Sequence, residues 1–356
     1  MNCKKVFYLW FMKNYTIKDI AKLADVSKGT VDRVLHNRGK VSKKALDKVN
    51  VVLSEIDYKP NLIARNLKNN KIYRICILLP DPNLDAYWLP CIEGINEAKT
   101  EFSSFNVVIE SYFFNPTSTS SFIETNEALL KTTPDAVLLV PLFYKEALDA
   151  IDNYNSLGII SGTFNNQLKS RIINSFVGQD LFQSGRVAAS LLDVLLDEGL
   201  IAIIHIDEEY ENAQHMQEKE KGFRNYFADS LTKKFEIVTL NIKSDDAQKS
   251  LTDFLNKHAN LKGIFVTTSK SHQIAEVISK REDKDIAFVG YDLLKPNLKY
   301  LQKNIINFLI HQNPKKQAYK GLSLLIEYLI FEKKISKEVL LPLYIINNEN
   351  VKEYLK

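Results

Sequence analysis

From residue 72 onward, apolar runs of strand length alternate with segments whose apolar residues have helical spacing. Runs such as YRICILLP, PDAVLLVP, LIAIIHI and KGIFVTT are apolar at nearly every position rather than at every second one. Such continuous runs are typical of parallel strands that helices bury on both faces. A chain of 356 residues with this many runs is long for one compact unit, so the pattern predicts two doubly wound α/β lobes.

Ligands of such sheets bind beyond the carboxyl ends of the strands, so the residues just after each run are candidates for a binding site. These residues combine aromatic rings, amides, hydroxyls and a carboxylate, a mixture that suits a polyhydroxylated ligand such as a sugar. Core packing is the alternative for Tyr87 and Trp88, and a helix cap or turn is the alternative for Asp292. These strand-end residues are 81–88, 143–144, 163–166, 268–269 and 292. The candidates selected among them are Tyr87, Trp88, Phe143, Asn165, Thr268, Ser269 and Asp292.

The first 71 residues differ from the rest of the chain in charge. They carry 13 Lys and 3 Arg against 5 Asp and 1 Glu, a net charge of +10. Because the whole chain has a formal charge of +4, the remaining residues sum to −6. A basic head on a mildly acidic body indicates that the head binds a polyanion and the body does not.

The segment TIKDIAKLADVSKGTVDRVLHNRG has the spacing of two short helices. Thr16 is expected to cap the first helix, with Asp19 three residues later as a variant of the capping box. Ser27 is expected to cap the second, and Gly39 to end it with a left-handed residue. A third helix is expected from Ser42 onward. Two helices joined by a short turn and braced by a third describe a helix-turn-helix.

The second helix of such a module lies in the major groove with its first residues at the base edges. Lys28 can donate there to guanine, while Gly29 permits close approach. Periodicity and charge alone leave a second interpretation open, a small helical bundle with a solvated charged face. The predicted DNA-contacting set adds the two capping residues and the donors suited to phosphates, namely Thr16, Ser27, Thr30, Arg33, His36, Asn37 and Lys40.

Residues 16–68 resemble the DNA-binding head of the lactose-repressor (LacI/GalR) family almost continuously. Two positions depart from that family. Asp25 stands in the turn where Gly is usual, and Asp tolerates the left-handed conformation better than most residues. Asp32 stands where Ser is usual, near the phosphate backbone, where its carboxylate would be repelled unless Arg33 or Lys28 holds it.

Pro60 ends the third helix, and Asn61 can cap a further helix of one to two turns, which is marginal alone in water. The resemblance implies that this is the family's hinge helix, ordered when two copies pair over the centre of an operator. It further implies that Leu67 inserts into the minor groove, while Ala64 permits close packing of the two helices. A plain linker is the alternative. The predicted hinge set is Asn61, Ala64, Arg65 and Leu67.

Segments of the body, among them NSFVGQDLFQSG, KGFRNYF, VGYDLLKPNLKYL and INFLIHQNPKKQAYKG, resemble the effector core of the same family, in particular its ribose-binding-like branch. The resemblance implies that Asp292 and Gln312 contact the effector. Lys219 stands where many members place an Arg that grips the ligand, and Lys lacks the bidentate fork of Arg. The implied fold is a type I periplasmic-binding-protein-like core of two lobes behind a small all-α head.

The predicted organisation is an N-terminal extension (1–13, with Met12 as an alternative start), a helix-turn-helix domain (14–59), a hinge (60–71) and a core (72–356). Within the core, the first lobe is expected over about 72–175 and 307–338. The second lobe is expected over about 176–306 and 339–356.

Other functional classes find little support in the sequence. No dinucleotide-binding, P-loop or nucleophile-elbow motif occurs, so we expect neither an enzyme nor a cofactor. The three Cys and six His lack metal-ligand spacing, and the Cys usage fits a reducing compartment, the cytoplasm. The N-terminal apolar run is short for a signal peptide, and no run is long enough to span a bilayer.

The alternative from another class is a solute-binding receptor for a sugar transporter, which would have the same kind of core. Such a receptor needs export and has no use for a basic head. We therefore expect a homodimeric regulator that binds a pseudo-palindromic DNA operator and a small, sugar-like effector, without membrane contact.

Overall fold

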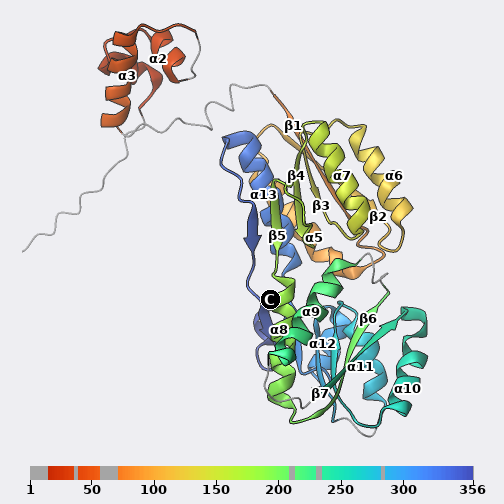
Figure 1. The fold of residues 1–356 in the computed structure, drawn as a ribbon. Coiled ribbons are helices and arrows are strands. Elements are labelled where there is room, and N and C mark those ends of the chain that lie inside the picture. Colours follow the sequence, from red (N-terminus) through yellow and green to blue (C-terminus); the bar gives the residue numbers. More distant parts are fainter. Residues whose placement is uncertain are drawn as a thin grey trace, which may run out of the picture. The chain divides into compact units, whose positions relative to one another are not determined.

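The computed structural model describes residues 15–35, 39–56, 71–207, 213–229, 235–281 and 285–355. The chain forms two compact units, Met1–Arg65 and Asn66–Lys356, called here the head and the core (Figure 1). The N-terminal extension and nearly all of the predicted hinge lie outside the described residues.

Three helices make up the described part of the head: α1 (Ile17–Leu23), α2 (Lys28–Leu35) and α3 (Lys43–Glu55). The predicted capping box at α1 is confirmed. The Asp19 backbone N–H donates to the Thr16 hydroxyl, and the Asp19 carboxylate accepts from the Thr16 backbone N–H at 2.9 Å. Ser27 caps α2 by accepting from the Thr30 backbone N–H at 3.1 Å.

The head has a small hydrophobic interior of its own. Ile20, Val31 and Val49, one from each helix, are fully buried in it. Asp25 in the turn before α2 has φ 50°, and Gly39 after α2 has φ 69°. Both are the left-handed conformations that the sequence predicts, so local signals alone account for the path of this module.

The described strands form two six-stranded sheets. The first sheet has the order β11 (Glu338–Leu340), β5 (Ser175–Gly178), β4 (Ile160–Asn165), β3 (Ala136–Leu139), β1 (Tyr73–Pro80), β2 (Val107–Phe114). The second has the order β12 (Tyr344–Ile346), β10 (Phe308–His311), β9 (Ala287–Tyr291), β8 (Leu261–Val266), β6 (Gly199–Ile206), β7 (Phe235–Ile242). Neighbouring strands pair in parallel except β10 and β12.

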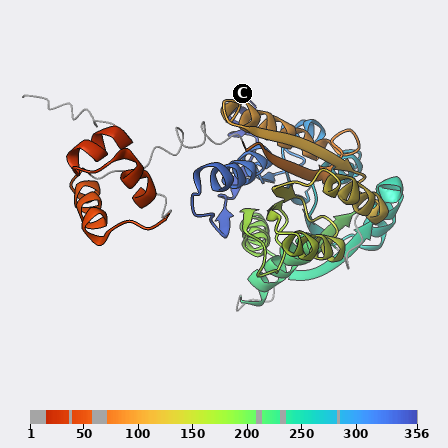
Figure 2. The ribbon, with the colours of Figure 1, turned by 90° about the horizontal axis from the view of Figure 1, so that it is seen from above.

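Helices cover both faces of each sheet (Figure 2). The first sheet lies between α5 (Leu89–Glu101) with α13 (Pro314–Phe331) and α6 (Thr119–Leu130) with α7 (Tyr144–Ser156). The second lies between α8 (Leu181–Leu195) with α9 (Gln214–Ala228) and α10 (Ala247–Lys257), α11 (Ser271–Ser279) and α12 (Lys295–Leu301).

Burial on both faces explains why the strands are continuously apolar. Along β1, Ile75 and Ile77 pack in the cluster with α5 and α13, whereas Cys76 and Leu78 pack in the cluster with α6 and α7. All four side chains are fully buried. The predicted pair of doubly wound lobes is confirmed. Within the described ranges, each helix is too short or too polar to cross a membrane.

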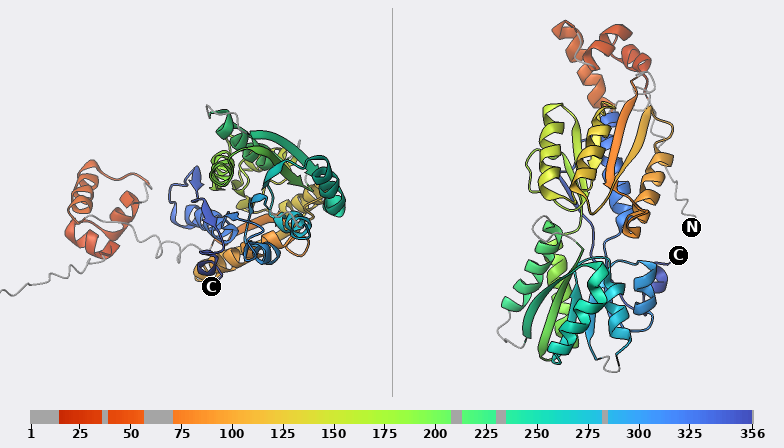
Figure 3. Two further views of the ribbon diagram at one scale, coloured as in Figure 1. Left: turned by 90° about the horizontal axis from the view of Figure 1, so that it is seen from below. Right: turned by 90° about the vertical axis from the view of Figure 1, so that its right-hand side faces the viewer.

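Three short segments connect the lobes, following β5, β10 and β11 (Figure 3, right). The predicted lobe boundaries need correction at all three of them. β5 was expected mostly in the second lobe, from residue 176, but it pairs with β4, so the chain crosses after residue 178 rather than at 176. β10 was expected in the first lobe but pairs with β9, so the chain crosses after residue 311 rather than at 307. β11 pairs with β5, which keeps residues 339 and 340 in the first lobe. In each case a short strand completes its pairing before the chain crosses.

Candidate functional site

The start of α2 presents a polar surface within the head. Ser27, Lys28 and Gly29 are exposed, whereas Val31 is fully buried against α1 and α3. Arg33 is exposed one turn further along. Within the head, this face of α2 is therefore accessible to a large partner such as a nucleic acid.

Three predicted DNA-contacting hydroxyls, those of Thr16, Ser27 and Thr30, also have partners inside the head. The Thr16 hydroxyl donates to Asp19 Oδ2 at 2.6 Å, and Thr30 Oγ1 lies 2.9 Å from Ser27 Oγ. Lys40 is exposed. The remaining predicted DNA-contacting and hinge residues lie outside the described residues: His36, Asn37, Asn61, Ala64, Arg65 and Leu67.

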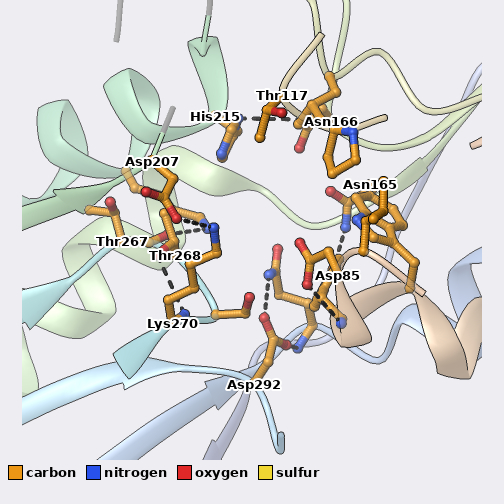
Figure 4. A pocket seen from close by; sticks show the side chains of 18 of the residues that line it. Asp85, Thr117, Asn165, Asn166, Asp207, His215, Thr267, Thr268, Lys270 and Asp292 are labelled. Carbon is orange, nitrogen blue, oxygen red and sulfur yellow. Dashed lines mark hydrogen bonds and ion pairs between the residues drawn. The ribbon is translucent and has the colours of Figure 1, made fainter. Parts of the chain in front are cut away.

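A cavity of about 310 Å³ lies in the core at the carboxyl ends of the strands of both sheets (Figure 4). It is close to the switch point of each sheet, between β1 and β3 and between β6 and β8. Of the predicted effector residues, the cavity is lined by Tyr87, Trp88, Asn165, Lys219, Thr268, Ser269, Asp292 and Gln312.

The wall from the first lobe is aromatic and amide-rich. Tyr87 and Trp88 are 6% and 3% exposed, and their ring centroids lie 4.8 Å apart at 85°. The Asn165 side-chain amide donates to the Tyr87 hydroxyl. Burial raises the pKa of Tyr87 well above its ordinary value, which keeps that hydroxyl neutral. Both aromatic residues pack in the hydrophobic interior of the first lobe and also line the cavity, so core packing and ligand contact do not exclude each other.

The wall from the second lobe carries charges. Asp207 follows β6 directly, and its carboxylate accepts from Lys270 Nζ at 2.5 Å. It also accepts from the backbone and hydroxyl of Ser244. Burial raises the pKa of Asp207, but the hydrogen bonds from Lys270 and Ser244 outweigh this and hold the pKa below its ordinary value. The Asp207 carboxylate is therefore ionised and paired.

Asp292 follows β9 and is 2% exposed. Its Oδ1 accepts from the Gln312 backbone N–H at 3.0 Å and its Oδ2 from Gln312 Nε2 at 2.7 Å. An ionised carboxylate has about four acceptor positions on its two oxygens. Both oxygens therefore keep acceptor capacity for a ligand with two adjacent donors.

Lys219 projects from α9 and is 2% exposed. Its Nζ donates to the Thr267 carbonyl at 2.8 Å and lies 3.8 Å from the centroid of the Tyr291 ring. A buried ammonium needs such contacts because losing hydration is costly. These contacts fix the cation at the edge of the cavity, although it lacks the planar fork of the Arg expected at this position.

A buried polar network stands behind Lys219. His205 Nδ1 lies 2.6 Å from the Thr267 hydroxyl, and His205 Nε2 lies 2.7 Å from Glu220 Oε2. Arg224 donates to Glu220 Oε1 at 2.7 Å. Burial raises the pKa of Glu220, but the hydrogen bonds from His205, Thr239 and Arg224 outweigh this and lower it to about 2. The network holds the Thr267 segment that Lys219 also contacts.

One predicted effector residue lies elsewhere. Phe143 is absent from the described lining of the cavity, and Leu142 takes the corresponding place. Phe143 packs in the first lobe, with its ring centroid 6.0 Å from that of Phe114 and 6.1 Å from that of Phe122. Phe143 is the N-cap residue of α7, and its side chain joins the apolar cluster which that helix buries.

Several residues of the cavity were not predicted from the sequence. Asp207 follows a strand just as Asp292 does, and this position could have revealed it. His215 lies on α9, so strand position gave no signal for it. Leu84, Asp85 and Asn166 lie within the strand-end ranges 81–88 and 163–166 but were not selected among the candidates. The other residues that were not predicted are Asn115, Pro116, Thr117, Leu142, Thr267 and Lys270.

The segment after β4 meets α9 across the cavity. Asn166 Nδ2 lies 3.4 Å from His215 Nδ1 (Figure 4). Lys169 Nζ lies 3.1 Å from Glu218 Oε1 in an exposed ion pair. Exposed pairs contribute only about 0–1 kcal/mol each, so this ion pair adds little to the contact between the lobes.

Comparison with known proteins finds a family match for each of the two units. Residues 16–61 match the bacterial regulatory proteins of the lacI family, and residues 75–333 match a periplasmic binding protein domain. The ribose operon repressor of Halalkalibacterium halodurans is 27% identical over 306 residues, which cover 82% of this chain and 86% of that protein.

Solved structures agree with these matches. A Bacteroides fragilis chain assigned as a LacI transcriptional regulator is 30% identical with a TM-score of 0.75, and the match covers 80% of this chain and 100% of that one. A glucose-galactose binding protein of Geobacillus stearothermophilus is 20% identical with a TM-score of 0.70, over 79% of this chain and 99% of that one, which shows a shared fold. The chain therefore belongs to the lacI family of bacterial regulatory proteins and carries a periplasmic binding protein domain as its core.

Proposed function

We propose that this chain is a transcriptional regulator which binds an operator through α2 and whose operator affinity depends on a sugar in the core cavity. The observation that carries the proposal is the cavity itself, which includes Asp292, Asn165 and Trp88, in a chain that also carries a helix-turn-helix head. Family membership and the name of the ribose operon repressor support the same function.

The charges of the cavity favour an uncharged sugar over a phosphorylated one. Three carboxylates line it, those of Asp85, Asp207 and Asp292, against the two ammonium groups of Lys219 and Lys270. Lys270 is paired with Asp207, and Asp292 stays available to ligand hydroxyls. A phosphate dianion would meet this surplus of carboxylates at close range, where charge repulsion is weakly screened. The proposed ligand class is a neutral monosaccharide with vicinal hydroxyl groups.

On the DNA side, Lys28 at the exposed start of α2 is proposed to reach base edges, with Arg33 and Lys40 on phosphates. A single head reads one half-site, so two copies on a pseudo-palindromic operator are proposed. Leu67 and Ala64 keep their proposed hinge functions, the minor-groove wedge and the close helix contact. The protein acts where the chromosome is, in the cytoplasm.

A solute-binding receptor is the second candidate, since the glucose-galactose binding protein shares the fold of the core. The head argues against it, because a receptor has no use for exposed basic residues at the start of a capped helix such as Lys28 on α2.

The test measures the thermal stability of the full chain against neutral monosaccharides and their phosphate esters. Binding of the full chain to DNA from the region upstream of its gene is measured with and without the stabilising sugar. Asp292→Asn should lose the stabilisation by sugar and the sugar response on DNA, yet still bind DNA. Asp149→Asn, an exposed Asp on α7, is the matched control and should behave like the unaltered chain. Equal stabilisation of both variants would refute the proposed site, and stabilisation by phosphate esters alone would refute the charge argument.

A further inference from the structure

The three segments that connect the lobes meet at one side chain. Gln179 follows β5 in the first crossing segment and is 2% exposed. Its Nε2 donates to the carbonyl of His311, at the end of β10, at 3.1 Å. The same Nε2 donates to the carbonyl of Pro342, in the third segment, at 2.7 Å. One amide group therefore ties together all three connections between the lobes.

An amide suits this position. Both neighbours of Nε2 are carbonyl oxygens, which accept but do not donate, so the side chain must present two N–H groups to them. The Gln179 Oε1 is buried and has no hydrogen-bond partner among the described residues. An unpartnered buried acceptor is unfavourable. The two donated bonds thus hold the amide in place despite this cost. A backbone bond from Leu341 to the Gly178 carbonyl, at 2.7 Å, joins the first and third segments beside it.

The second segment links this cluster to the cavity and to the first lobe. Gln312 follows His311 directly, and both its backbone and its side chain donate to Asp292. The Gln312 carbonyl accepts from Gln317 Nε2 on α13 at 2.7 Å. A continuous set of hydrogen bonds therefore runs from Gln179 through residues 311–312 to the proposed ligand contact Asp292 and to the helix that covers the first sheet.

We propose that Gln179 is a positioning residue that sets the angle between the lobes. Through residues 311–312 it makes that angle respond to the occupancy of Asp292. This second part rests on the proposed function, whereas the first part does not. A change in the lobe angle without Gln179 would leave the sugar contacts themselves intact but weaken their effect on the head.

The first test measures the distance between spin labels on the two lobes. The labels are attached to cysteines introduced at the exposed positions Lys131 (first lobe) and Lys257 (second lobe), in a chain with Cys3→Ser. Gln179→Met has the same length but no donor. Losing two hydrogen bonds shifts the population of lobe angles by about 10- to 100-fold, so the distribution of distances should move or broaden. Gln183→Met, an exposed Gln on α8, is the matched control. A distribution identical to that of the control would overturn the proposal.

A second variant keeps the test decisive if Gln179→Met does not fold. In Gln179→Glu, the carboxyl group would face the two carbonyl oxygens, and its ionised form would repel them. Protonation at acid pH restores one donor, so the label distances should return towards those of the unaltered chain as the pH falls. A folded Gln179→Glu chain whose distances do not change with pH would equally overturn the proposal.

The second part is tested with the sugar that stabilises the full chain. For Gln179→Met, the ratio of operator dissociation constants with and without that sugar should fall towards one, while sugar affinity changes less than this ratio. An unchanged ratio would refute the link to Asp292. If no sugar or operator binds even the unaltered chain, the proposed function fails, whereas the label distances still decide the effect of Gln179 on the lobe angle.

Discussion

Two glycines bring the backbones of α8 and α9 into direct contact, and Gly185→Ala tests this contact. A Cβ atom at Gly185 would lie 1.9 Å from the Lys219 carbonyl oxygen and 2.9 Å from the Phe223 nitrogen. At Gly222 it would lie 1.9 Å from the Phe182 carbonyl oxygen. Real Cβ contacts essentially never fall below 3.0 Å. The obstructing atoms belong to a helix backbone, which cannot move away as a flexible side chain could. The helices must therefore separate by about 1 Å.

The expected sign of the stability change follows from two opposing effects. In an unobstructed helix interior, Gly→Ala stabilises by about 1 kcal/mol. Overpacking a core costs about 1–3 kcal/mol, and a backbone contact belongs at the upper end of that range. We expect a net loss of about 2 kcal/mol for Gly185→Ala, from about 3 minus about 1. For a unit of this size, that lowers Tm by about 4–8 °C.

The same displacement should reach the cavity, because α9 carries Lys219 and His215 to it. Moving α9 by about 1 Å stretches the 2.8 Å bond from Lys219 to Thr267 beyond hydrogen-bonding range, so sugar affinity should fall about tenfold.

Scanning calorimetry of the full chain measures Tm. Gly321→Ala on α13 is the control, since the nearest atoms there belong to the Leu138 side chain, which can shift. A Gly185→Ala chain that melts at or above the unaltered Tm would refute the argument from the close helix contact.

Two further predictions concern the head and the buried network. Lys28→Ala should weaken operator binding by about 1–3 kcal/mol, whereas Lys22→Ala, at an exposed position on α1, should have little effect. Fluorescence anisotropy at several salt concentrations measures the operator affinity of both variants. Equal losses of affinity in the two variants would contradict base reading by α2. Glu220 has a folded pKa of about 2 against an ordinary 4.5, so its stabilisation is present above pH 4.5 and is lost as the pH falls from there towards 2. Relative to Glu220→Gln, the unaltered chain should therefore lose about 3 kcal/mol of unfolding free energy over that range. Denaturant titrations at several pH values measure the unfolding free energy of both chains. If that free energy falls equally with pH in the two chains, the assigned stabilisation by Glu220 is wrong.

Local signals predicted much of the fold. The caps at Thr16 and Ser27 and the left-handed residues at Asp25 and Gly39 depend on atoms only a few positions apart, so they are legible in the sequence. The long apolar runs likewise indicated that both faces of each sheet are buried. β5 and β10 were not identified as strands from their pattern, because each has only two or three consecutive apolar residues between polar ones. This is also why the lobe boundaries after β5 and β10 were misplaced.

The rule that ligands bind beyond strand ends predicted part of the cavity, including Trp88, Asn165 and Asp292. It failed for Phe143, since the rule fixes where a residue lies along the chain but not which way its side chain points. Only the resemblance indicated Lys219, and nothing indicated His215, because both lie on a helix.

The sequence by itself determined the class of each unit: a capped, basic helical head and a core of parallel strands with polar residues at their carboxyl ends. Hydrogen-bonded caps and strand burial need only near neighbours or a hydrophobic interior. The tertiary structure alone decided which polar groups meet. Asp207 pairs with Lys270 across 63 positions, and Gln179 reaches carbonyls 132 and 163 positions away. Such pairs depend on the order of strands in the sheets and on where the chain crosses between lobes, which long-range packing decides.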